Sequence, residues 1–189
     1  MSEVLVAVTG GTLKGGQSDG IVSLKGVPYA APPIGPLRWA APRPVERWDG
    51  VRDALEYGPS CPQPAERPEG WDAETAESED CLVLNVWTPG LDDGRRPVMV
   101  WIHGGGYTTG SGSWPLYNGA ALARRGEVVV VTVNHRLGVL GYLHLAGLGG
   151  PELATSGNAG MLDLVASLEW VRDNIESLGG DPALSLIHI

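Results

Sequence analysis

The chain has few of the residues that mark nucleic-acid-binding or metal-binding proteins. Its 189 residues include 13 lysines and arginines against 22 aspartates and glutamates, which gives a formal net charge of −9 at pH 7. A chain this acidic does not offer the basic surface that binds nucleic acid. It has two cysteines and four histidines, with neither a C-x-x-C pair nor a histidine cluster, which argues against a metal site.

Long apolar runs and a basic leader are also missing. No apolar run reaches the length that spans a bilayer, so we expect no membrane partner. The N-terminal segment, MSEVLVAVTGG, carries an acidic residue where a signal peptide needs basic ones, and its short apolar stretch is interrupted by Thr9 and Gly10. We therefore expect a cytoplasmic protein, or a secreted one if the N-terminus of the sequence is incomplete.

What remains is the composition of a globular domain. Hydrophobic residues make up 43% of the chain and charged residues 19%, which supplies a core and excludes a disordered chain. Residues 4–29 predict short strands, with turns at Gly15-Gly16 and at Ser18-Asp19-Gly20. The proline-rich residues 28–68 predict extended surface structure, and residues 69–80 predict an exposed loop.

The pattern changes after residue 80, where strand signals become continuous. Leu82–Trp87 predicts a strand, and Val98–Ile102 and Val128–Val133 are apolar runs without alternation. Such runs predict strands that are buried on both faces, as in a parallel sheet covered by helices.

Two helices are predicted among these strands. Ala120–Arg125 predicts a short helix that Gly126 ends, and apolar residues three or four apart predict a long helix that Asn158 caps and Gly179 stops. Strands that alternate with helices give an α/β fold. We expect N-terminal antiparallel strands that lead into a mostly parallel sheet with flanking helices.

The segment with the most chemical information is a buried strand that runs into His103-Gly104-Gly105-Gly106-Tyr107. Three successive glycines allow backbone conformations that other residues avoid and leave bare amides for a ligand to approach. Two N–H groups aimed at one point stabilise the oxyanion of a tetrahedral intermediate, and losing one such donor costs about 3–4 kcal/mol of transition-state stabilisation. A plain glycine-rich turn is the alternative. The succession of strand, HGGG and aromatic residue favours the oxyanion loop of esterases and lipases. A phosphate-binding loop is excluded because G-x-x-x-x-G-K-[ST] is absent.

Motifs along nearly the whole chain resemble the type B carboxylesterase/cholinesterase family, whose members have the α/β-hydrolase fold. Besides the glycine loop, these motifs are Gly26–Trp39, Ser78–Trp87, Asn134–Gly138, Gly157–Asp163 and Gly179–Pro182. The SEDCL block argues against the hormone-sensitive-lipase group, which also has HGGG. The chain departs from the family at His135, where Tyr is usual, and at Leu164, where Gln is usual.

The resemblance implies which residues form the oxyanion hole. Gly105 and Gly106 would donate their amides, and Gly104 would shape the loop. A third donor would be the amide after the nucleophile, which this chain lacks. His103 would fix the entrance of the loop.

The resemblance also implies structural contacts elsewhere. These are the ion pairs Arg38–Glu79 and Arg136–Asp163 and a disulfide between Cys61 and Cys81. Without an export signal the same two cysteines would stay reduced, and both alternatives remain open here. Trp71 lies in the loop between the cysteines, either as a packing residue or as an aromatic residue that faces a cationic substrate.

The nucleophile motif does not occur where the family has it. In this fold a strand turns sharply through G-x-S-x-G into a helix. Ser185 has leucine on both sides, so neither it nor His188 is expected to be catalytic. The literal motif Gly16-Gln-Ser18-Asp-Gly20 precedes a strand and predicts a hairpin turn. We therefore interpret residues 1–189 as the N-terminal part of a single α/β-hydrolase domain that is truncated before the nucleophile elbow, with no catalytic residue of its own.

The resemblance implies a carboxylic ester hydrolase that works through a serine ester intermediate on small-molecule esters, without a cofactor. The fragment alone is expected to be inactive, because an oxyanion hole without a nucleophile forms no acyl-enzyme. The alternative is a non-catalytic adhesion or binding protein on the same fold, like the neuroligins. The intact HGGG loop argues against it, since a binding scaffold has no need of amides aimed into a pocket.

Overall fold

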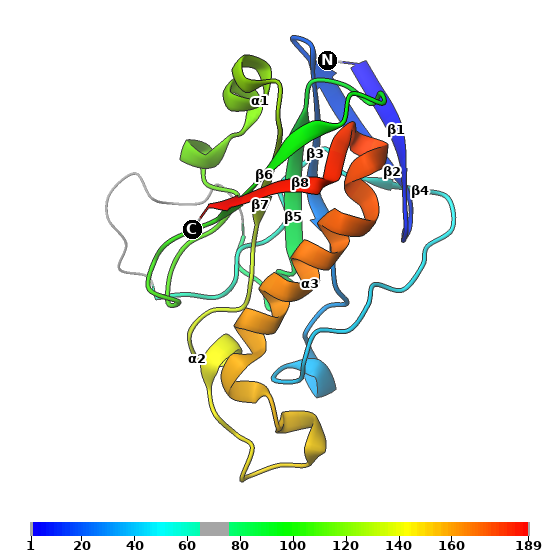
Figure 1. Ribbon diagram of the computed structural model, residues 1–189. Helices are drawn as coiled ribbons and strands as arrows, with labels where there is room; N and C mark the ends of the chain where they lie inside the picture. The colour runs from blue at the N-terminus through cyan, green and yellow to red at the C-terminus, as the bar shows by residue number, and fades with distance from the viewer. Residues whose placement is uncertain (1, 65–75, 189) are drawn as a thin grey trace.

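The computed structural model describes residues 2–64 and 76–188, with side chains described as far as Leu184. One eight-stranded mixed sheet runs through the described residues in the order β1-β2-β3-β5-β7-β6-β8, with β4 paired beside β2 (Figure 1). The strands are β1 Ser2–Val8, β2 Gly11–Ser18, β3 Ile21–Pro28, β4 Val51–Asp53, β5 Val83–Thr88, β6 Arg96–Ile102, β7 Val129–Val133 and β8 Gly180–His188.

The helices are α1 Ala120–Gly126, α2 Gly138–Tyr142 and α3 Ala159–Asn174. Short 3-10 helices occupy Gly35–Leu37, Pro115–Tyr117, Pro151–Leu153, Ser156–Asn158 and Ile175–Leu178. None of the helices in the described ranges is long and apolar enough to cross a membrane. The predicted α/β fold is confirmed.

The sheet has an antiparallel part and a parallel part. Strands β1, β2, β3, β5 and β7 join one another antiparallel in that order. The parallel part consists of β7, β6 and β8, together with the short ladder between β2 and β4. The parallel region is therefore smaller than expected, because β5 runs antiparallel to the strand that follows it in the sheet.

Helices cover both faces of the central strands. Val129, Val131 and Val133 of β7 belong to the same buried cluster as Trp170 and Val171 of α3. The intervening Val130 packs with Ala123 of α1 on the other face. Figure 1 shows α3 running across the sheet and α1 lying apart from α3. Because successive strand residues point to opposite faces, burial on both sides requires an unbroken apolar run.

Strand β6 is an exception to that rule. The prediction that residues 98–102 are buried on both faces is wrong, since Val98, Val100 and Ile102 are buried while Met99 and Trp101 are only partly so. Its alternation means that one face of β6 is incompletely covered by the described residues.

The N-terminal hairpins also differ from the sequence-based prediction. Gly15-Gly16 is not a turn but lies inside β2, where Gly16 pairs with Ser23. A Cβ on Gly15 would lie 2.7 Å from the Ser23 carbonyl oxygen, so glycine is needed for the strands to approach. The first turn is at Thr9-Gly10 instead, and β4 was not predicted.

The predicted turn at Ser18-Asp19-Gly20 is confirmed. Ser18 pairs with Ile21 across a two-residue turn in which Asp19 and Gly20 have positive φ angles of 52° and 76°. This backbone is typical of a hairpin and not of a nucleophile elbow, which would open a helix. The literal G-x-S-x-G motif is therefore structural.

The long helix is confirmed with two changes at its ends. Asn158 makes no side-chain capping hydrogen bond, because it already belongs to a 3-10 turn that leads into α3. At the other end the helix tightens into Ile175–Leu178, and Gly179 ends it in the left-handed conformation with φ of 74°.

Candidate active site

The glycine loop begins where β6 ends, at the carboxyl edge of the parallel strands. Ile102 and His103 are buried, and the next four residues, Gly104 to Tyr107, are exposed. The φ angles are 119° at Gly105, 60° at Gly106 and 63° at Tyr107. Such angles disfavour residues with a Cβ, and a Cβ on Gly105 would also overlap the Thr109 carbonyl group. The backbone of the loop therefore requires glycine at Gly105, the second of the three.

The Gly105 and Gly106 amides are left open, while the Gly105 carbonyl group is occupied. The Gly105 carbonyl oxygen accepts the Thr108 and Thr109 amides, both at 3.1 Å, and the hydroxyl groups of the same threonines at 3.0 and 3.3 Å. Among the described residues, neither the Gly105 N–H nor the Gly106 N–H donates to a protein acceptor. Exposed amides held in a fixed loop are available to a ligand.

A hollow of about 270 Å³ lies beside the loop. Gly104, Gly106 and Tyr107 line it from the loop, and Met161 and Leu164 line it from α3. Its lining is mainly apolar and also includes His103 and His135. The hollow has the character of a small-molecule site, with a few polar groups in an apolar surround.

Two stacked histidines form the floor of this region. The rings of His103 and His135 are 4.9 Å apart and 11° from parallel. Nδ1 of His103 lies 2.8 Å from the Gly104 carbonyl oxygen, and Nδ1 of His135 lies 2.9 Å from that of Arg136. A carbonyl oxygen can only accept, so each ring carries its proton on Nδ1.

Burial keeps both rings uncharged. It lowers the pKa of His103 to about 4, with a further lowering by the neighbouring His135. It also lowers the pKa of His135. Both histidines are therefore neutral at neutral pH, and neither is a strong base toward a substrate.

Asn134 joins the loop to the sheet from behind. Its side-chain oxygen accepts the Gly112 amide at 2.7 Å and the Ser111 hydroxyl at 3.2 Å, and its side-chain amide donates to the Pro59 carbonyl oxygen at 3.0 Å. Its own carbonyl oxygen accepts the Tyr29 hydroxyl at 2.6 Å. All of its polar groups are paired, so the segment that follows the glycine loop is firmly anchored.

The structure brings Arg136 and Asp163 together in a fully buried pair, with side chains 1% and 0% exposed. Two guanidinium nitrogens of Arg136 lie 2.8 and 2.7 Å from the carboxylate oxygens, and its backbone amide donates to the same group. The remaining nitrogen donates to the carbonyl oxygens of Arg38 and Ala40, both at 2.9 Å. Burial raises the pKa of Asp163, although the Arg136 guanidinium opposes it. This pair ties α3 to the extended segment around residue 40.

Arg38 and Glu79 also lie together, in two hydrogen bonds of 2.5 and 2.9 Å. Their side chains are 39% and 28% exposed, so water screens this pair more than the buried one. Trp71 lies outside the described residues.

The two cysteines lie close together in the fold. Cys61 and Cys81 are buried and unbonded in this structure, which corresponds to the reduced alternative. The Cys61 sulfur accepts the Leu137 amide at 3.2 Å. A hydrogen bond with Cys61 and burial raise the pKa of the Cys81 thiol. The two side chains are thus neighbours within hydrogen-bond reach.

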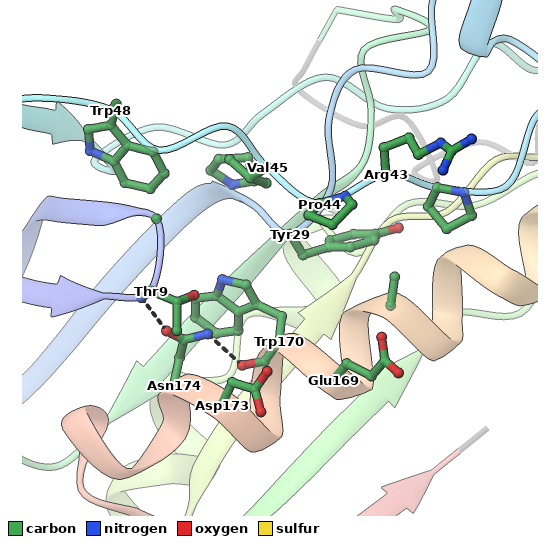
Figure 2. A pocket seen from close by; sticks show the side chains of 14 residues that line it. Thr9, Tyr29, Arg43, Pro44, Val45, Trp48, Glu169, Trp170, Asp173 and Asn174 are labelled. Carbon is green, nitrogen blue, oxygen red and sulfur yellow. Dashed lines mark hydrogen bonds between the residues drawn. The ribbon is translucent and has the colours of Figure 1, made fainter.

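A second hollow of about 430 Å³ lies between the extended segment at residues 42–48 and α3 (Figure 2). Asn174 spans it by accepting the Thr9 amide at 2.7 Å and donating to the Trp170 carbonyl oxygen at 2.8 Å. These bonds fasten the β1–β2 turn to the end of α3, and we assign the hollow no catalytic role.

Sequence reasoning did not identify the residues that support the loop. Thr108 and Thr109 belong to no motif, and Asn134 was part of a family motif without a role assigned to it. His135 was noted only as a departure from the family. His135 follows β7 as His103 follows β6, and the two rings meet because these parallel strands are neighbours in the sheet.

Comparison with known proteins identifies the family. The model of the carboxylesterase family matches residues 2–185. The chain belongs to the carboxylesterase family. It is 47% identical to the para-nitrobenzyl esterase of Bacillus subtilis (strain 168) over 183 residues, which are 96% of this chain and 37% of that protein. It is 49% identical to the phenmedipham hydrolase of Pseudarthrobacter oxydans over 178 residues, or 92% of this chain and 34% of that protein.

Solved esterase structures share the fold. The carboxylesterase EST55 of Geobacillus stearothermophilus superimposes with a TM-score of 0.90 at 46% identity, over 97% of this chain and 36% of that one. A structure of PNB esterase gives a TM-score of 0.92 at 45% identity, over 98% of this chain and 38% of that one. The carboxylesterase chain described here thus spans somewhat more than a third of the length of these relatives.

Proposed function

We propose that this carboxylesterase segment supplies the oxyanion hole of a serine carboxylic ester hydrolase. The observation that carries the proposal is the pair of exposed Gly105 and Gly106 amides, which have no acceptor among the described residues and follow a core strand. Family membership supports the same assignment.

In this proposal a serine hydroxyl attacks the ester carbonyl carbon, and the carbonyl π electrons move to the oxygen. The Gly105 and Gly106 amides then donate to that oxyanion. Its collapse expels the alcohol and leaves an acyl-enzyme, which water hydrolyses to the carboxylic acid. The amides contribute because they bind the charge that develops in the transition state and not the neutral ester.

The nucleophile, its base and the acid that orients the base are proposed to lie beyond residue 189, in the part of the relatives that this chain does not match. Neither of the two serines that the sequence analysis considered is an alternative. Ser18 lies in a hairpin turn, and Ser185 lies in β8, where it pairs with Val98. By itself the segment is proposed to be inactive.

The substrate class is proposed to be small carboxylic esters. Apolar walls from Met161, Leu164 and Tyr107 beside the oxyanion loop support an uncharged acyl or alcohol group. A non-catalytic binding protein is not favoured, because the relatives compared above carry hydrolase or esterase names.

The test is hydrolysis of p-nitrophenyl acetate by the full-length protein that carries this segment. We expect a burst of p-nitrophenol equal to the enzyme concentration, abolished by a fluorophosphonate that labels one serine outside residues 1–189. A chimera in which this chain replaces the matched segment of the Bacillus subtilis para-nitrobenzyl esterase is a second route to the same measurement. A folded full-length protein that releases no p-nitrophenol and takes up no fluorophosphonate would contradict the proposal.

A further inference from the structure

The two donor amides of the loop are held in different ways. A peptide group is planar and trans, so its N–H and its C=O point in opposite directions and turn together. The Gly106 N–H belongs to the same peptide group as the Gly105 carbonyl, which the loop's own Thr108 and Thr109 hold. The Gly105 N–H belongs to the same group as the Gly104 carbonyl.

The Gly104 carbonyl is held by a side chain. His103 Nδ1 donates to it at 2.8 Å, and no other donor to it is found in the described parts of the chain. The direction of the Gly105 N–H therefore depends on the plane of the His103 ring. A rotated ring would release the peptide group and turn the amide away from the oxyanion.

The His103 ring is in turn held by His135. The two rings are stacked at 4.9 Å and 11°, and His135 is only 2% exposed. Its own plane is fixed by the 2.9 Å hydrogen bond from Nδ1 to the Arg136 carbonyl oxygen. Arg136 is immobilised by Asp163 of α3. A continuous set of contacts thus runs from α3 to the Gly104–Gly105 peptide group.

We propose that His135 is a positioning residue for ester hydrolysis, which aims the Gly105 amide by stacking on His103. This inference rests on the proposed esterase function. His135 touches neither the oxyanion nor the nucleophile in this account, and its effect passes through His103 and the Gly104 carbonyl group. Since His135 orients a donor that acts in the transition state, its loss lowers kcat and leaves KM nearly unchanged.

Two substitutions separate the stacked ring from other properties of His135. His135→Leu removes the flat ring, and His135→Phe keeps it. In the full-length protein we expect kcat for p-nitrophenyl acetate to fall about tenfold in the Leu variant, which is less than the loss of a whole donor. We expect a fall of less than about threefold in the Phe variant, with KM within about twofold in both. His144→Leu, at an exposed histidine outside the stack, is the matched control and should leave kcat unchanged.

Two further measurements distinguish positioning from a general loss of structure. Fluorophosphonate titration gives the concentration of competent sites, so that kcat is expressed per folded enzyme. The affinity for a trifluoromethyl ketone, which forms a tetrahedral adduct, should fall by the same factor as kcat/KM across the variants. Nitrogen-15 spectra of His103 should show a proton on Nδ1 in the wild type and in the Phe variant at pH 7.

The outcomes separate this inference from the function on which it rests. A wild-type protein without turnover or fluorophosphonate uptake overturns both. An active wild type with an unchanged kcat in His135→Leu overturns the positioning role alone. Equal losses of kcat in the Leu and Phe variants also overturn it, because the stacked ring would then not be what matters. A tenfold loss of kcat in His135→Leu together with a nearly normal kcat in His135→Phe supports the positioning role.

Discussion

In the glycine loop, the Gly105 and Gly106 amides have no partner in the described chain, whereas Asn134 behind the loop pairs every polar group it has. We call Asn134, Arg136 and Asp163, with their hydrogen-bond partners, the polar layer. The loop keeps two donors open at the surface, whereas the side chains of the polar layer are paired in the interior. The open amides are tolerated because they lie at the surface, where water can bind them, whereas the buried polar groups need protein partners.

The largest expected effect is on the stability of the polar layer. Arg136→Met leaves the Asp163 carboxylate buried without its partner, and we expect the free energy of unfolding to fall by about 3–5 kcal/mol. Urea denaturation measures the change. Arg38→Met, at the half-exposed pair with Glu79, is the matched control and should cost no more than about 1 kcal/mol.

The double substitution Arg136→Met/Asp163→Leu sharpens this prediction. It removes both charges and should recover most of the lost stability, because an apolar pair of similar volume is often as stable as the ion pair. If both single arginine substitutions cost the same, the distinction between the buried and the half-exposed pair fails.

The next largest effect is on catalysis by the loop. In the full-length protein, Gly105→Ala should lower kcat by about 10²–10³-fold, because its φ of 119° and the overlap with Thr109 force the loop to move and turn the amide away. Gly106→Ala should cost less than about tenfold, since its φ of 60° is open to alanine at about 1–2 kcal/mol and no other atom lies within 4 Å of the new Cβ.

Gly35→Ala serves as the control for backbone strain alone. Gly35 begins the 3-10 helix Gly35–Leu37, has a φ of 54° and has open space around a Cβ. It should cost a similar amount of stability to Gly106→Ala and leave kcat unchanged. Equal kcat values for the Gly105 and Gly106 variants would show that the Gly105 amide has no special role.

A smaller effect is expected from pH. The His103 pKa is about 4 in the folded protein against an ordinary value of 6.5, so below pH 6.5 the unfolded chain binds protons that the folded one does not. Stability should therefore fall as the pH falls from about 6.5 to 4, by up to about 3 kcal/mol from this group. Denaturation midpoints across this range measure it. In His103→Gln the stability should depend less steeply on pH. An unchanged slope would show that His103 is not the group that causes the pH dependence.

The smallest effect is expected at Ser18. Ser18→Ala should change neither turnover nor stability, because the side chain is exposed in a hairpin turn and its hydroxyl donates to the Asp19 carboxylate at 3.3 Å. Loss of fluorophosphonate labelling in this variant would show that the literal G-x-S-x-G motif is catalytic after all.

The sequence was sufficient for the parts of the fold that follow from burial. Val129–Val133 lies between helices on both faces, and its unbroken apolar run predicts this burial. The glycine loop was found because HGGG after a strand has few other uses. The assignment of its donors to Gly105 and Gly106 came from family resemblance and remains a prediction.

The sequence was insufficient where structure depends on contacts between distant segments. Gly15-Gly16 resembles a turn by composition, but lies in a strand because β3 approaches too closely for a Cβ. The stack of His135 on His103 depends on the lateral order of β6 and β7, which no local pattern contains. The hydrogen bond from the Leu137 amide to the Cys61 sulfur likewise joins segments that are far apart in the sequence.

The most direct measurement of the central claim is a crystal structure of the full-length protein inhibited by a phosphonate ester, whose P=O oxygen stands in for the oxyanion. We predict that this oxygen lies about 2.7–3.1 Å from the backbone nitrogens of both Gly105 and Gly106. A phosphonyl oxygen bound by other donors, with these two amides turned elsewhere, would contradict the account.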